Sequence, residues 1–84
     1  MKTVAQLTYI PLNTEDPRKK VQELLEHLAQ FDGIDIEVGY LSTSIIGDYG
    51  HIFNILRELY EIMLDETKDF RFHVELLSPM SGEE

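Results

Sequence analysis

Three consecutive hydroxyl side chains, Ser42, Thr43 and Ser44, lie within an otherwise apolar stretch of the sequence. On a strand, Thr43 shares a face with Leu41 and Ile45, while the two serines point to the opposite face. The apolar neighbours of Thr43 predict that its side chain lies beneath helices. A hydroxyl there either hydrogen-bonds to nearby backbone or offers a directional partner to a ligand in a mostly apolar pocket. The residue types alone leave both alternatives open.

Aromatic residues could complete a pocket around Thr43. Tyr9, Tyr40 and Phe53 offer flat surfaces on which a ring can stack. If the hydroxyl of Thr43 serves a ligand, these walls favour a planar ring.

The same region lacks the settings that activate a nucleophile. Neither Ser42 nor Ser44 lies in a Gly-x-Ser-x-Gly elbow, and the sequence places no histidine beside them. Residues 47–50 lack the lysine and the spacing of a phosphate-binding loop. We therefore expect a protein that is not an enzyme.

The pattern of histidines predicts no metal site and no cofactor. His27, His51 and His73 have no mutual spacing of a ligand pair, and the sequence contains no cysteine. Glu23 and His27 do stand four residues apart, but such a pair is common on a solvated helix face.

The chain has 84 residues and a formal net charge of -9, with 7 Lys and Arg residues in total. This length predicts one domain, residues 1–78, followed by a flexible tail at 79–84. A basic face for nucleic acid is not expected. The sequence shows no signal-peptide core, and no apolar run approaches the roughly 20 residues that span a bilayer. We therefore expect a cytoplasmic protein that binds neither nucleic acid nor membrane.

Four segments alternate apolar and polar residues, as half-buried strands do. Pro11 ends the first strand because it has no N–H to donate. A tight hairpin near residues 39–41 joins the second and third strands. The predicted strands are 3–10, 34–40, a segment starting at 41 or 42, and 70–76.

Two segments follow the period of an amphipathic helix. The first is capped by Asp16, has Pro17 at its first position and stops at Gly33. The second is capped by Asp48 and runs to about residue 65. Their predicted buried stripes are Val21, Leu24, Leu25, Leu28 and Phe31 for the first, and Ile52, Leu56, Leu59, Tyr60 and Met63 for the second.

The order βαββαβ predicts an α+β fold, a ferredoxin-like sandwich in which a four-stranded antiparallel sheet carries two helices on one face. The open sheet face combines apolar residues with polar ones and is a candidate oligomer interface. Its expected members are Val4, Ile10, Ile46 and Leu77 among Gln6, Thr8, Ser42, Ser44 and His73. The expected core is Leu7, Leu25, Leu28, Ile36, Ile45, Leu56, Leu59 and Phe72.

Three segments carry a likeness to a known family. Residues 4–14, VAQLTYIPLNT, are similar to a strand ending in Pro-Leu-Gly-Thr, with Asn13 in place of glycine. Residues 41–53, LSTSIIGDYGHIF, match a pattern of Ser/Gly-Thr, a glycine, an Asp and a final Phe, and a closing strand follows a helix of matching length. In this order the sequence resembles the YkoF-related family of thiamine- and hydroxymethylpyrimidine-binding proteins. It departs from the family at Ile46, at Gly50 and in lacking a basic end to the closing strand.

The resemblance implies a ferredoxin-like domain that binds thiamine or its pyrimidine precursor without catalysis and forms homodimers or homotetramers through the sheet. Carried over by position, Thr43 is the main polar candidate and Ser42 lies beside it. Pro11 and Leu12 shape the loop after the first strand. Gly47 and Phe53 belong to the matched motif, Gly47 for its backbone geometry. The alternative is a structural or regulatory oligomerisation module with no small ligand, which would lack a ring-sized pocket near Thr43.

Overall fold

The computed structural model describes residues 2–67 and 69–78. The predicted tail at 79–84 lies outside the described residues. The elements follow the predicted order βαββαβ. Their bounds are β1 (Lys2–Pro11), α1 (Pro17–Leu28), β2 (Asp35–Val38), β3 (Thr43–Asp48), α2 (Tyr49–Glu66) and β4 (Phe70–Leu77).

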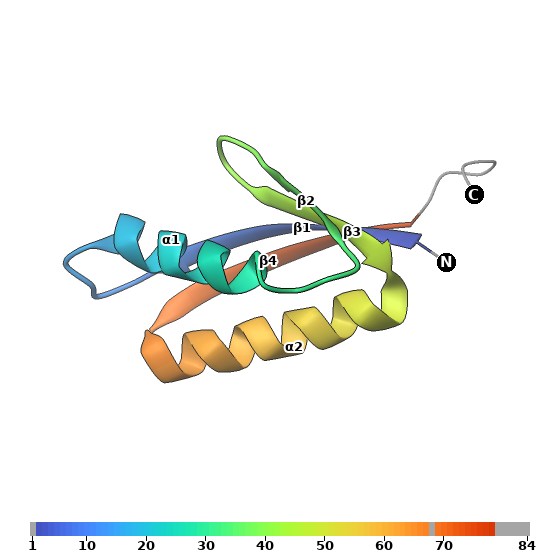
Figure 1. The fold of residues 1–84 in the computed structure, drawn as a ribbon. Helices are drawn as coiled ribbons and strands as arrows, with labels where there is room; N and C mark the ends of the chain where they lie inside the picture. Colours follow the sequence, from blue (N-terminus) through green and yellow to red (C-terminus); the bar gives the residue numbers. More distant parts are fainter. Residues whose placement is uncertain (1, 68, 79–84) are drawn as a thin grey trace.

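The four strands form one antiparallel sheet in the order β2-β3-β1-β4. Both helices lie on the same side of it, which makes this a ferredoxin-like fold (Figure 1). Leu7 in β1 pairs with Thr43 in β3 and with Val74 in β4, so these three residues share the helix-covered face. The next residue, Thr8, pairs with His73 and belongs to the open face.

Helix α1 begins as the sequence predicts. Its first residue is Pro17, and the Asp16 carboxylate accepts a hydrogen bond from the backbone N–H of Lys19 at 3.2 Å. This bond satisfies one of the N–H groups that a helix start leaves without an intrahelical partner.

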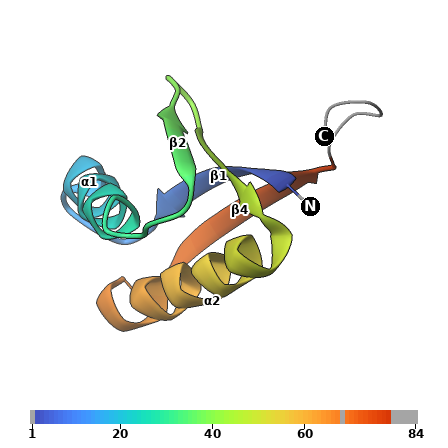
Figure 2. The same ribbon diagram turned by 45° about the vertical axis from the view of Figure 1, so that its right-hand side comes forward.

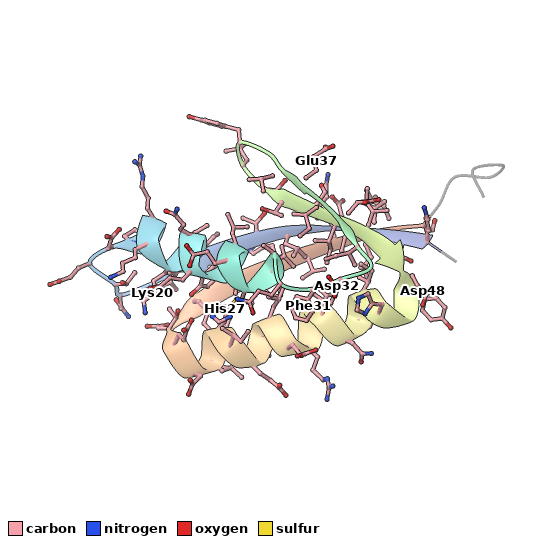
Figure 3. The ribbon with its side chains drawn as sticks, in the orientation of Figure 1. Lys20, His27, Phe31, Asp32, Glu37 and Asp48 are labelled. Carbon is pink, nitrogen blue, oxygen red and sulfur yellow. The ribbon has the colours of Figure 1, made fainter. Side chains whose placement is uncertain are left out.

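The end of α1 differs from the prediction. The helix stops at Leu28, not at Gly33. Beyond it, the N–H groups of Gln30 and Phe31 each donate to the carbonyl three residues earlier, a tighter turn than the α-helix. Phe31 still packs against the core from this turn (Figure 3). Gly33 instead takes a φ of 79°, a left-handed conformation that favours glycine, just before β2.

Helix α2 begins after Asp48, whose carboxylate accepts from the N–H of Gly50 at 3.2 Å, as predicted for a cap. Its buried stripe is rotated from the predicted one. The buried residues are Ile52, Ile55, Leu59 and Met63. Leu56 is only half-buried and Tyr60 is exposed. The prediction of these two residues as buried therefore placed the stripe too far around the helix.

The core lies between the sheet and the two helices. Its buried members are Ala5, Leu7, Leu24, Leu28, Ile45, Ile52, Ile55, Leu59 and Met63. Four of the predicted core residues are among them, and Leu25, Leu56 and Phe72 pack partly buried against the group.

The prediction for β2 was wrong in its burial. All four of its residues are exposed, including Ile36 at 37 % and Val38 at 62 %. Their register partners, Ile45 and Thr43, are buried on the helix face. The helices pack on β1 and β3, and the hairpin of β2 and β3 projects past them (Figures 1 and 2). This geometry leaves a recess between the hairpin and α1.

Candidate ligand-binding cavity

A cavity of about 140 Å³ lies between α1 and the β2–β3 hairpin. Leu7, Tyr9 and Thr43 of the sheet contribute to it, together with Leu59 of α2. One side is formed by four apolar side chains of α1, namely Val21, Leu24, Leu25 and Leu28. The other side is the hairpin segment 38–42. The wall is therefore mostly apolar with a few hydroxyl groups, as is usual for small-molecule sites.

Among the described residues, Thr43 is the one polar residue that is buried, with 9 % of its surface exposed. It points to the helix side of the sheet, as its apolar neighbours predict. Within the described residues its hydroxyl makes no hydrogen bond, and no fully buried side-chain nitrogen or oxygen there lacks a partner. The hydroxyl therefore retains access to the cavity that Thr43 lines. It is free to bond to a group placed there.

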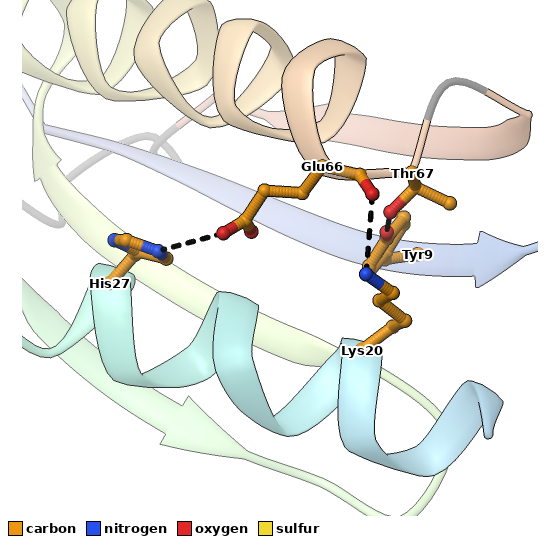
Figure 4. Close-up of polar contacts among 5 residues, drawn as sticks. All are labelled: Tyr9, Lys20, His27, Glu66 and Thr67. Atoms are coloured by element: carbon orange, nitrogen blue, oxygen red, sulfur yellow. Dashed lines mark hydrogen bonds and ion pairs between the residues drawn. The ribbon is translucent and has the colours of Figure 1, made fainter.

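Tyr9 forms an aromatic wall of this cavity. Its hydroxyl shares a hydrogen bond with the hydroxyl of Thr67, next to the end of α2 (Figure 4). Its ring also meets Phe70 edge-to-face, with centroids 5.9 Å apart and an interplanar angle of 74°. These two contacts fix the position of the Tyr9 ring.

The hairpin tip forms the mouth of the cavity. The backbone N–H of Gly39 donates to the carbonyl of Ser42 at 2.7 Å, which closes the tight turn that the sequence predicts. Tyr40 is fully exposed at this turn and is among the residues that line the cavity. Ser42 is half-buried and contributes both to the cavity and to a depression on the open sheet face.

The remaining predicted site residues lie elsewhere. Pro11 lines a groove beside the cavity, and the N–H of Leu12 donates to the carbonyl of Asp69 at 2.8 Å. Phe53 is exposed on α2 and lines neither hollow. The structure thus brings Thr43, Ser42, Tyr9 and Tyr40 together around one cavity and places Pro11 next to it.

Gly47 has a packing role. A Cβ atom at this position would lie 2.9 Å from Cγ2 of Ile34 and 3.3 Å from the carbonyl oxygen of Gly33. The residue is buried on the helix face of β3 and does not line the cavity. Its φ is not in the left-handed region, so the absent side chain matters here through the close approach of the turn at residues 33–34.

The apolar wall from α1 was not among the predicted site residues. Its members were recognised only as the buried stripe of an amphipathic helix. No signal in the sequence separates them from ordinary core residues, because an amphipathic stripe has the same pattern whether it covers a strand or a recess.

Polar contacts hold α1 against the end of α2. The ammonium group of Lys20 donates to the carbonyl of Glu66 at 3.2 Å, and Nε2 of His27 lies 3.9 Å from the Glu66 carboxylate (Figure 4). Lys20 thereby bonds to a carbonyl in the last turn of α2, where carbonyls lack intrahelical partners. The hydrogen bond of Lys20 joins the helix that forms one wall of the cavity to the end of α2.

Within residues 2–67 and 69–78, no cluster of three or more His, Asp or Glu side chains could hold a metal ion. No helix in that part of the chain is long and apolar enough to cross a membrane.

No protein-family model matches the sequence, and no curated protein matches it. Solved structures do share its fold. A protein from Streptococcus pneumoniae is 20 % identical and superposes with a TM-score of 0.88, covering 96 % of this chain and 90 % of that one. A hypothetical protein from Methanocaldococcus jannascii is 22 % identical, with a TM-score of 0.82 and coverage of 98 % and 84 %.

A third similar structure has a descriptive name. It is a "putative thiamine biosynthesis/salvage protein" from Thermotoga maritima, 18 % identical, with a TM-score of 0.86 and coverage of 98 % of this chain and 88 % of that one. At these identities the likeness establishes the ferredoxin-like fold. It does not assign the chain to the YkoF-related family.

Proposed function

We propose that this chain binds thiamine or a related hydroxymethylpyrimidine, without catalysis, in the cavity around Thr43. The observation that carries the proposal is a buried threonine whose hydroxyl remains available inside an apolar cavity. A pyrimidine offers ring nitrogens and an exocyclic amine as hydrogen-bonding partners, together with two apolar faces. The cavity offers a complementary hydroxyl and apolar walls.

The size of the cavity suits one ring. Its volume is about 140 Å³, and an apolar cavity of about 150 Å³ is known to accept benzene. A pyrimidine ring would fill it, and substituents would extend toward the hairpin mouth or toward the groove beside it. The fold shared with the Thermotoga maritima thiamine biosynthesis/salvage protein, itself named only as putative, agrees with this ligand class.

The direct test is titration calorimetry with thiamine and with hydroxymethylpyrimidine, accompanied by thermal melting. A ligand at 100 times its dissociation constant should stabilise the folded chain by about 2.7 kcal/mol if it binds only that form. Neither heat nor a melting shift with either ligand, up to millimolar concentration, would refute the proposal.

A matched pair of variants locates the site. Thr43→Val keeps the shape and removes the hydroxyl, so it should weaken binding by about 0.5–1.5 kcal/mol. Ser44→Ala removes the adjacent hydroxyl, which points to the open sheet face, and should leave affinity unchanged. Equal losses in both variants would place the ligand elsewhere.

We also propose that the open sheet face joins two chains in a homodimer or homotetramer. The register places Val4, Ile10, Ile46 and Leu77 on this face, as the sequence predicts. Large hydrophobics of the face are exposed in the single chain, Ile10 at 40 % and Leu77 at 42 %. The alternative function, an oligomerisation module without a ligand, would use the same face and would leave the cavity empty in every titration.

A further inference from the structure

A larger groove adjoins the cavity at the start of α1. Its volume is about 690 Å³, and it is more open than the cavity. The two hollows share Tyr9, Val21 and Leu25. The three shared side chains place the groove directly beside the cavity.

Arg18 supplies the charge of this groove. The other lining residues are apolar apart from Gln22 and the hydroxyl of Tyr9, and no acidic residue is among them. Arg18, Gln22 and Leu25 recur at the spacing of one helix face, so the guanidinium and the amide lie on the same side as the shared apolar wall.

The neighbouring cations are directed elsewhere. Lys20 donates to the carbonyl of Glu66, and Lys19 lines a separate hollow with Asp16 and Glu23. Within residues 2–67 and 69–78, Arg18 forms no ion pair. Among the three consecutive basic residues Arg18, Lys19 and Lys20, Arg18 is thus the one that lines a hollow with no carboxylate in its lining.

We infer that the groove binds an anionic phosphate group carried by the ligand whose ring occupies the cavity. This inference rests on the proposed function and names its ligand class as a phosphorylated pyrimidine. Arginine presents a planar fork of donors that bonds two phosphate oxygens at once, and Gln22 adds an amide donor. A neutral groove would give a phosphate no comparable partner.

The separation of Arg18 from the cavity sets the length of the connection between ring and phosphate. Arg18 and Leu25 are seven residues apart, which is about 10 Å along a helix. Arg18 also repels the positively charged thiazolium of thiamine, so the groove favours the phosphorylated pyrimidine over thiamine.

Calorimetry with hydroxymethylpyrimidine and its monophosphate ester tests the inference. The unmodified chain should bind the ester about tenfold more tightly, since a hydrogen bond to a charged group contributes about that factor. Arg18→Gln should abolish the difference and leave the affinity for the unphosphorylated compound unchanged. The control Arg57→Gln removes an exposed arginine of α2 that lines neither hollow and should preserve the difference.

The outcomes separate the two proposals. Equal affinities for the two compounds in the unmodified chain, or a preference that survives Arg18→Gln, would overturn the phosphate inference while leaving pyrimidine binding in place. Absence of binding by both compounds would overturn the proposed function and the inference together.

Discussion

The hydroxyl of Tyr9 shares a hydrogen bond with the hydroxyl of Thr67, a residue 58 positions later in the chain. Tyr9 lines both the cavity and the groove, and Thr67 directly follows α2. The bond therefore connects the wall of the candidate site to the end of the longer helix. The position of the Tyr9 side chain in the site therefore depends on this contact with Thr67 as well as on β1.

A double-mutant cycle measures that connection. Tyr9→Phe and Thr67→Val should each lower the free energy of unfolding by about 0.5–1.5 kcal/mol, the usual net value of a hydrogen bond. The double variant should cost little more than either single one because the same bond is lost. Urea denaturation provides the measurement, and Tyr49→Phe, at an exposed position, is the control. Strictly additive losses would show that the two hydroxyls do not depend on each other.

The sequence was sufficient to predict the fold because each element carries its own local signal. Alternation marks the strands, the capping residues Asp16 and Asp48 mark the helix starts, and Pro11 lies at the last position of β1. These signals act within a few residues. They can be identified without knowing which elements pack against one another.

Features that depend on packing between elements were less predictable. Ile36 belongs to an alternating segment, as a buried strand residue does. Alternation indicates which face of the sheet its side chain occupies, but not whether a helix covers that face at the sheet edge. Helix α2 carries apolar side chains over a wide arc, so periodicity allows two overlapping stripes and only the sheet selects the one containing Ile55. Phe31 packs inward at helical spacing although α1 has already ended at Leu28. The apolar pattern therefore continues past the end of the helix and does not reveal where it stops.

In the candidate site too, features with a local signal were predictable and features that depend on packing between elements were not. The inward position of Thr43 was predictable because a polar residue among alternating apolar ones is visible in the sequence. The apolar wall from α1 was not, since its residues have the same pattern whether they cover a strand or a recess. Gly47 entered through the resemblance, and Phe53 entered both as an aromatic residue that could form a wall and through the resemblance. The structure places both away from the cavity.

Truncation of Leu59 should be among the costly core substitutions. Its side chain is fully buried on α2, so Leu59→Ala leaves a cavity and should lower the free energy of unfolding by about 2–5 kcal/mol. Leu64→Ala on the same helix removes a side chain that is 45 % exposed and should cost much less. Chemical denaturation of both variants gives the comparison. Similar losses would contradict the observed orientation of α2.

Two glycines should respond to alanine with opposite signs. Gly47→Ala places Cβ 2.9 Å from Ile34 and should destabilise the fold by about 1–3 kcal/mol, as overpacking does. Gly50→Ala meets only the Asp48 carboxylate at 3.4 Å within the first turn of α2. It should stabilise the chain by about 0.5–1 kcal/mol because alanine loses less backbone entropy in a helix. A melting temperature that does not fall for Gly47→Ala would refute the packing reason given for Gly47, and one that does not rise for Gly50→Ala would refute the entropic reason given for Gly50.

A lysine on the open sheet face should separate the proposed oligomer into single chains. Thr8 and Ser44 lie on that face, where Thr8 pairs with His73 and Ser44 pairs with Gln6 and Glu37. In an assembly formed by this face, Thr8→Lys or Ser44→Lys would bury an added ammonium group between the two sheets, and the cost of removing that group from water opposes association. Light scattering should then give a multiple of the chain mass for the unmodified protein and for Asn54→Lys, which adds the same charge on exposed α2. The two sheet variants should give the mass of one chain, and a one-chain mass for the unmodified protein would exclude the interface.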